Sequence, residues 1–251
     1  MQSTELALRP SYWASVSGGK DSLFMLNLIL HNLDKYPLDG VVHFELEIDY
    51  PFGIRFVRIK PTKSWYELYE RYGFPTRVAR WCNDKYKLTA KKQLQEFMKT
   101  QGFYTVFYIG YCSDEEKRFA KRVDLQKVER YPLVEESIEE DTVWAWAKTQ
   151  PIFNHYYLTQ KRCGCMYCPM TSFINFAYLY KYYPDHFAFM INKMRETEII
   201  REKELGRPFS CISSNPKYNA DYLERIIKTN WVYKLEDLEQ KNSNLKLFFG
   251  L

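Results

Sequence analysis

Hydrophobic positions along the chain follow two periods, one typical of strands and one of helices. Residues 12–16 (YWASV) form a short apolar run that predicts a buried strand, and leucines between residues 23 and 33 recur at helical spacing. A further helix is expected at 90–99. Further strands are expected at residues 41–48, 54–60 and 104–109. This β–α–β order predicts an α/β fold, Rossmann-like, whose parallel sheet carries helices on both faces.

The pattern changes after residue 133. Ser137 precedes the acidic residues Glu139, Glu140 and Asp141, which predicts that Ser137 caps a helix with an acidic first turn. Residues 171–204 are helical by pattern, and their many aromatic side chains are expected to pack between helices. We therefore expect an α/β domain over residues 1–172 and a mostly helical C-terminal extension over residues 173–251.

Composition sets broad limits on the class of protein. With 251 residues, 46% of them hydrophobic, the chain can bury a sizeable core. The net charge of +5 suits a nucleotide or nucleic-acid partner, and equally a solvated surface of mixed charge. No apolar run approaches the ~18 residues of a membrane span, and the N-terminus has no signal-like pattern. The sequence thus predicts a cytoplasmic protein without a membrane segment.

A glycine turn joins the first expected strand to the first expected helix, in the stretch SVSGGKDSLFML (residues 15–26). Gly18 and Gly19 allow positive φ and close backbone approach, so that successive N–H groups can face one concavity. The N-terminus of the helix and the ammonium group of Lys20 add positive charge. The turn therefore predicts an anion site.

Two common phosphate-binding patterns do not fit this turn. A Walker A loop needs glycine where Ala14 stands and a hydroxyl where Asp21 follows Lys20. The dinucleotide pattern G-x-G-x-x-G is also absent. The phosphate chemistry must therefore be of another kind.

Three cysteines, Cys163, Cys165 and Cys168, lie within six residues. Such a loop offers thiolate ligands to Zn²⁺ or to an iron–sulfur cluster, and the alternative is that these cysteines are small buried hydrophobic residues. Cys112 and Cys211 belong to no such pattern and are expected to be structural.

The segment Ser17–Ser22 (SGGKDS) resembles the PP-loop of the ATP pyrophosphatases. Four later segments are similar, in the same order, to the phosphoadenosine phosphosulfate (PAPS) reductase family of that superfamily. These segments are RWCNDKYK (80–87), IGYCSDEEKR (109–118), YPL with Glu140 and Asp141 (131–141) and CGCMYCP (163–169). The resemblance extends over residues 12–172 and identifies the chain as PAPS reductase-like.

This resemblance implies an adenine nucleotide alpha hydrolase-like domain with a phosphate site on the PP-loop. Lys20 and Asp21 would be catalytic, and Gly110 and Arg118 would complete the site. Glu115 would either contact the ligand or pair with Arg118. The nucleotide-binding residues it implies are Ser17, Gly18, Gly19, Lys20, Asp21, Ser22, Gly110 and Arg118.

The same resemblance adds Cys82 as a fourth ligand to the three clustered cysteines. Cys82, Cys163, Cys165 and Cys168 would then hold a [4Fe–4S] cluster, with Zn²⁺ as the alternative metal. A cluster held by three cysteines, with one open iron that carries sulfur, is a further alternative.

The expected function is that of an ATP pyrophosphatase and sulfurtransferase. ATP with Mg²⁺ would be attacked at its α-phosphate, pyrophosphate would leave, and the adenylylated acceptor would take up sulfur. Candidate partners are a tRNA or DNA acceptor and a sulfur-donor protein.

Two alternatives stay open at this stage. One is a thiol-dependent reductase of PAPS or adenylyl sulfate, although the chain ends KNSNLKLFFGL without that family's catalytic cysteine motif. The other is a non-catalytic nucleotide-binding regulator.

Overall fold

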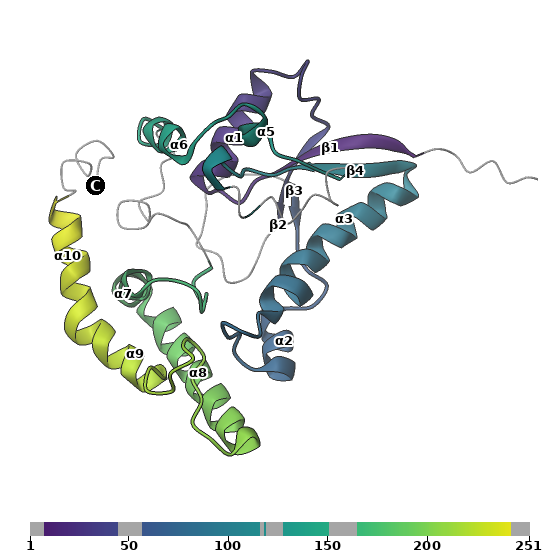
Figure 1. Ribbon diagram of the computed structural model, residues 1–251. Helices are drawn as coiled ribbons and strands as arrows, with labels where there is room; N and C mark the ends of the chain where they lie inside the picture. The colour runs from purple at the N-terminus through teal and green to yellow at the C-terminus, as the bar shows by residue number, and fades with distance from the viewer. Residues whose placement is uncertain (1–7, 45–56, 116–117, 119–127, 151–164, 242–251) are drawn as a thin grey trace, which may run out of the picture. The chain divides into compact units, whose positions relative to one another are not determined.

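The computed structural model describes residues 8–44, 57–115, 118, 128–150 and 165–241 (Figure 1). The described residues form two compact units that interleave along the chain. The first unit takes the residues up to 62 and those from 87 to 150, and the second takes those from 63 to 86 and from 165 to 241.

The first unit is built on a five-stranded parallel sheet with the strand order β3-β2-β1-β4-β5. Its strands are β1 (Arg9–Ser15), β2 (Gly40–Phe44), β3 (Val57–Ile59), β4 (Phe103–Tyr108) and β5 (Glu129–Arg130). Four of them confirm expected strands, although residues 45–48 and 54–56 of those expectations lie outside the described residues. The two-residue strand β5 was missed, because so short a segment carries no periodicity.

Helices cover both faces of this sheet, as Figure 1 shows. They are α1 (Lys20–Leu30), α3 (Leu88–Thr100), α5 (Pro132–Glu135) and α6 (Glu140–Ala147). Ala14 and Tyr108 pair in register and contribute to a core with α1, α5 and α6, whereas the neighbouring pair Trp13 and Phe107 faces a second core with Leu94 of α3. Successive side chains of a strand point to opposite faces, so the central strands are buried on both sides. The α/β class with a parallel sheet is thus confirmed.

The predicted cap at Ser137 is wrong. Ser137 has a positive φ of 55°, and its N–H bonds to the carbonyl of Val134 at 3.0 Å in the turn that closes α5. The N-cap of α6 is Glu139, whose side chain makes no capping bond. The acidic first turn, Glu140 and Asp141, is as expected.

The second unit is helical in its described residues. Its elements are α2 (Trp65–Tyr72), a π-helical turn η1 (Cys82–Lys87), α7 (Phe173–Tyr182), α8 (Pro184–Leu205), α9 (Ala220–Ile226), a second π-helical turn η5 (Ile227–Trp231) and α10 (Val232–Lys241). The helical pattern of 171–204 divides at Pro184, because proline lacks an N–H and forces the preceding residue, Tyr183, out of the helical region. Residues 63–86 and 165–172 also belong to this unit, and the domain boundary at residue 172 stays a prediction.

The aromatic side chains of α7 pack against helices of the same unit. Phe173 contacts the ring of Trp231 at a centroid distance of 5.5 Å, and Tyr180 contacts Phe187 at 5.2 Å. Among the residues that the structure describes, no helix is both long enough and apolar enough to cross a membrane.

Candidate functional site

The glycine turn lies at the carboxyl end of β1, in the middle of the sheet. The neighbours of β1 are β2 on one side and β4 on the other, so connections leave in opposite directions. In open parallel sheets, ligands bind outside the carboxyl ends of the strands at such a switch point. Gly18 has a φ of 77°, a conformation that favours glycine, and Gly19 is the N-cap of α1. The sequence and the topology therefore indicate the same anion site.

Two serine hydroxyls fix the shape of this loop. Ser22 Oγ donates to the carbonyl oxygen of Gly19 at 2.9 Å and accepts from Ser17 N at 3.2 Å. Ser17 Oγ accepts from Gly19 N at 3.4 Å. Ser22 is buried, whereas Ser17 is exposed. Ser22 thus closes the loop from inside and Ser17 faces outward.

Gly110 follows β4 and lies directly against the start of α1. A Cβ at this position would stand 2.9 Å from the carbonyl carbon and oxygen of Asp21 and 3.0 Å from Ser22 N. These are backbone atoms, which cannot turn aside as a flexible side chain can. The structure therefore brings Gly110 to the glycine turn, and only glycine allows this approach.

Lys20 is buried, with 3% of its surface exposed. Its Nζ lies 2.5 Å from Asp21 Oδ1 and 3.0 Å from Glu140 Oε1, and 5.1 Å from the centre of the Trp144 ring. Burial lowers the pKa of Lys20, but the hydrogen bonds and charges of Asp21 and Glu140 outweigh it and raise that pKa above its ordinary value. The loop lysine is therefore a fixed cation held from two elements.

Asp21 stands beside this lysine at the first turn of α1. Burial raises its pKa, and the negative charges of Glu115 and Glu140 act in the same direction, against the hydrogen bond from Lys20. The buried thiol of Cys112 lies 3.8 Å from Asp21 Oδ1. Burial and the charge of Asp21 raise the pKa of Cys112 to about 12, so this thiol stays protonated at neutral pH.

Arg118 lies on the segment that follows β4, with an exposed side chain. Its Nη1 donates to Glu115 Oε1 at 2.6 Å, and its guanidinium lies 4.5 Å from the centre of the Tyr111 ring. Glu115 Oε2 also accepts from the backbone N of Cys112 at 3.4 Å. Of the two roles expected for Glu115, ligand contact and pairing with Arg118, the structure shows the ion pair with Arg118.

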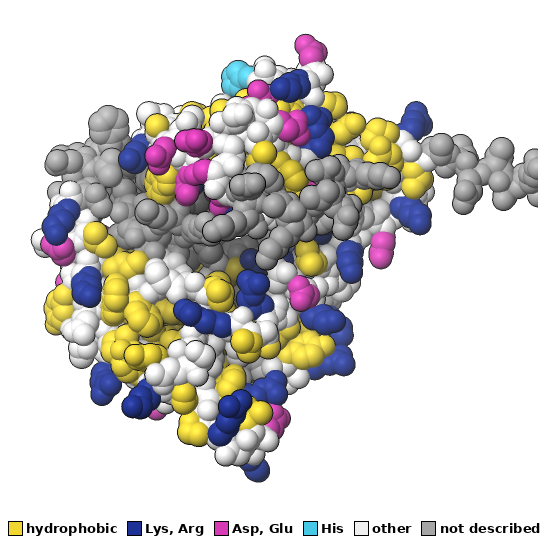
Figure 2. Space-filling model, viewed as in Figure 1, with side chains coloured by type: hydrophobic (Ala, Val, Ile, Leu, Met, Phe, Trp, Pro, Cys, Tyr) yellow, Lys and Arg dark blue, Asp and Glu magenta, His cyan; other side chains and the backbone are white. Residues whose placement is uncertain are grey.

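Helix α6 contributes residues that the sequence could not assign to the site. Glu140 and Trp144 are one helical turn apart, so both reach Lys20 from the same face. The N–H of Glu140 bonds to Asp114 Oδ1 at 3.2 Å, which joins the start of α6 to the segment after β4. Figure 2 shows acidic side chains gathered in the region of α6. Lys20 and Glu140 are 120 residues apart in the chain, so no local sequence pattern indicates their contact.

Three of the four candidate metal ligands lie in described parts of the second unit. Cys168 N donates to Cys165 O at 3.2 Å, which places both cysteines on one turn, and Cys82 begins η1. All three are partly exposed. The fourth, Cys163, lies outside the described residues, and within those residues no three His, Cys, Asp or Glu side chains form a metal-binding group.

The fully buried Trp65 connects the two cysteine segments. Its ring contacts Trp81, the neighbour of Cys82, at 5.7 Å, and Tyr167, the neighbour of Cys168, at 5.4 Å between ring centres. Both cysteine segments therefore pack on one aromatic side chain.

Two uncharacterized proteins of Methanocaldococcus jannaschii are similar to this chain. The protein MJ0973 is 27% identical over 74% of this chain, and MJ0066 is 23% identical over 67% of it. The chain spans 49% of the first relative's length and 38% of the second's. No family model and no solved structure matches.

Proposed function

We propose that this chain is a PAPS reductase-like PP-loop enzyme that binds ATP and cleaves it at the α-phosphate. The observation that supports this most directly is the glycine turn at the switch point of the sheet. There Gly18 takes a positive φ, α1 presents its N-terminus, and Gly110 packs on Asp21. Backbone N–H groups and a lysine at such a place suit the phosphates of an adenine nucleotide.

In the reaction we propose, Lys20 and Asp21 of the loop take part directly. An acceptor oxygen attacks the α-phosphorus, the bond from that phosphorus to the bridging oxygen breaks, and pyrophosphate leaves with the bonding electrons. Lys20 stabilises the charge that develops on the departing phosphates, and Mg²⁺ accompanies ATP in the same role. Asp21, whose raised pKa makes it a stronger base, takes the proton of the acceptor.

Lys20 must exchange a partner for this to happen. Its ammonium group is held by Asp21 and Glu140, so an arriving phosphate displaces the Glu140 carboxylate. Glu140 keeps the lysine charge compensated before the nucleotide arrives, because a buried ammonium without a partner is unfavourable. Ser17, Gly19, Ser22 and Arg118, the other nucleotide contacts expected from the sequence, would complete the nucleotide site.

We assign a metal site to Cys82, Cys163, Cys165 and Cys168. The donor set fits a soft metal, and Trp65 packs on both segments that carry the described cysteines. A [4Fe–4S] cluster would supply electron transfer or a sulfur-carrying iron, whereas Zn²⁺ would supply structural support.

The acceptor we propose is a tRNA or DNA, which would take sulfur from a donor protein after adenylylation. The net charge of +5 suits this class of acceptor. The reductase alternative needs an activated thiol outside the metal site. Burial raises the pKa of both Cys112 and Cys211, which makes either a poor nucleophile.

The test is pyrophosphate release from ATP and Mg²⁺ in the presence of tRNA or DNA. Wild-type protein should release pyrophosphate, Lys20→Ala and Asp21→Ala should abolish release, and Lys99→Ala, an exposed lysine of α3, should not change it. Nucleotide binding without turnover would favour the regulator, and sulfite formed from PAPS would favour the reductase. Metal analysis of protein purified without oxygen distinguishes iron from zinc.

A further inference from the structure

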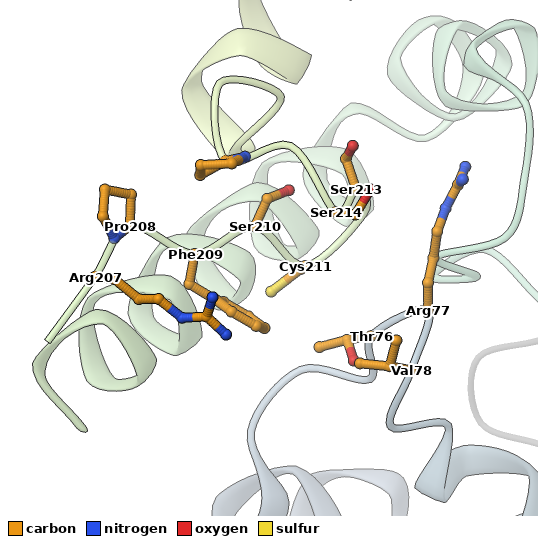
Figure 3. A pocket seen from close by; sticks show the side chains of 11 residues that line it. Thr76, Arg77, Val78, Arg207, Pro208, Phe209, Ser210, Cys211, Ser213 and Ser214 are labelled. Atoms are coloured by element: carbon orange, nitrogen blue, oxygen red, sulfur yellow. The ribbon is translucent and has the colours of Figure 1, made fainter. Parts of the chain in front are cut away.

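A cavity of about 620 Å³ lies in the second unit, between residues 76–78 and the loop 207–216 that joins α8 to α9 (Figure 3). Pockets for small molecules have volumes of roughly 300–1,000 Å³. The PP-loop, which belongs to the first unit, contributes no residue to this cavity.

The charged side chains that line the cavity are two arginines, Arg77 and Arg207. None of the described residues that line it is acidic. Among the described residues, Arg207 has no hydrogen bond or ion pair, and the side-chain bond of Arg77 uses Nε, which donates to the carbonyl of Pro169 at 3.3 Å. The terminal amino groups of both guanidinium groups remain suited to an anion, because arginine carries its charge at every physiological pH.

The walls of the cavity are fixed by hydrogen bonds before any ligand arrives. The backbone N of Arg77 donates to Cys211 O at 3.3 Å, which ties the two walls together. Ser210 Oγ donates to Tyr218 O at 2.7 Å, and Cys211 N donates to the buried carboxylate of Glu198 at 3.0 Å. Glu202 in turn accepts from Phe209 N at 3.0 Å. The nearby carboxylates are thus engaged with the backbone of the loop rather than lining the cavity.

The rest of the lining combines hydroxyl groups with one aromatic ring. In Figure 3, Arg207 and Phe209 lie toward one end of the view and Arg77 lies at the other, with Ser213 and Ser214 between them on the side of Arg77. Ser214 Oγ has no hydrogen bond within the described part of the chain.

We propose that this cavity binds a nucleotide along its length, with Arg77 and the two serines on its phosphate group at one end and Arg207 and Phe209 against its base at the other. Planar guanidinium groups pair with phosphate oxygens in two places at once, and serine hydroxyls add neutral donors. An aromatic ring offers a stacking surface to any base. The nucleotide is either a separate molecule or one residue of a nucleic-acid strand, and the chemistry of recognition is the same.

The experiment measures binding of adenosine monophosphate, a ten-nucleotide oligoadenylate RNA and inorganic phosphate to the full chain. Binding is measured in wild-type protein and in the Lys20→Ala variant, in which nucleotide binding at the PP-loop is weakened. Binding at the cavity is thereby measured separately, so the test holds even if the proposed ATP site is wrong. In both proteins, Arg77→Gln should weaken binding of the first two probes about tenfold, the loss of a charge-assisted hydrogen bond, and Arg207→Gln should weaken it through the lost contact of its guanidinium with the base. Arg225→Gln, an exposed arginine of α9, is the matched control and should change nothing.

The three probes distinguish the source of the phosphate. Tighter binding of the RNA than of adenosine monophosphate supports a nucleic-acid strand, and the reverse supports a separate nucleotide. Phe209→Leu should weaken binding of both nucleotides and leave inorganic phosphate unchanged. The proposal is overturned if the double variant of Arg77 and Arg207 binds every probe as tightly as Arg225→Gln does. It is also overturned if inorganic phosphate binds as tightly as the nucleotides.

Discussion

Gly110→Ala should displace the glycine turn and weaken ATP binding. The added Cβ would stand 2.9 Å from two backbone atoms of Asp21, whereas ordinary contacts begin at 3.4 Å, so one backbone segment must move by about 0.5 Å. Overpacking of this kind costs about 1–3 kcal/mol. If the turn moves, that strain and the altered N–H directions should weaken ATP binding by about tenfold or more, since 1.4 kcal/mol corresponds to a factor of ten.

The assay compares ATP·Mg²⁺ affinity by calorimetry with stability by urea unfolding. Gly102→Ala is the matched control, because Gly102 precedes β4 whereas Gly110 follows it. Its φ is +85° and a Cβ there would meet nothing within 4 Å, so the variant should lose about 1–2 kcal/mol of stability through backbone strain and keep its ATP affinity. Unchanged ATP affinity in Gly110→Ala would refute the role of this close approach.

Three further changes test the charges and the aromatic packing. Glu140→Gln should strengthen ATP binding about fivefold in a titration, because the carboxylate that competes with phosphate for Lys20 is removed and partly exposed pairs contribute about 1 kcal/mol. Glu198→Gln should become more stable relative to wild type as pH rises above 4.5. Burial raises the pKa of Glu198, so ionising this carboxyl as pH rises destabilises the folded wild type. The glutamine side chain does not ionise, so the variant avoids this loss. Urea unfolding at pH 4.5 and 8 measures the difference. Trp65→Leu should lose roughly 2–4 kcal/mol of stability and lower the metal bound per chain, because the fully buried Trp65 ring packs on both cysteine segments.

Each of these has an outcome that contradicts it. Weaker ATP binding by Glu140→Gln would mean that Glu140 helps to hold the nucleotide. If the difference in the free energy of unfolding between Glu198→Gln and wild type is the same at both pH values, the titration of Glu198 does not affect stability. Tyr233→Leu, at an aromatic position 66% exposed, is the control for Trp65, and equal losses of metal in both variants would separate metal binding from this packing.

The central part of the fold could be predicted from the sequence because its signals are local. The apolar run of β1, the glycine pair and the helical leucines follow one another without interruption, and the structure has strand, turn and helix in that order. Helix α2 was missed although its signal was present. Ser64 Oγ accepts from Glu67 N at 3.0 Å, and the Glu67 side chain accepts from Ser64 N, which forms a capping box.

The candidate site was only partly predictable. Gly110 was assigned to the site through the resemblance alone. The reason that glycine is required there, its close contact with the backbone of Asp21, becomes visible only once the strands are assembled into the sheet. The contact of Glu140 with Lys20 joins segments far apart in the chain, and the cavity of Arg77 and Arg207 joins segments more than 100 residues apart. Such contacts depend on tertiary packing, which periodicity does not encode.

The interleaving of the two compact units affects how the chain can fold. Strand β1 pairs with β4, in register from Arg9 with Phe103, so the middle of the sheet cannot close until more than 90 residues have been made. Residues 63–86, which belong to the other unit, are synthesised within that interval. Pairing between strands so distant in sequence slows folding, and it leaves the edges of β1 open to wrong partners while the chain is incomplete. Neither unit can be excised by cutting the chain once, so experiments on this protein need the full chain.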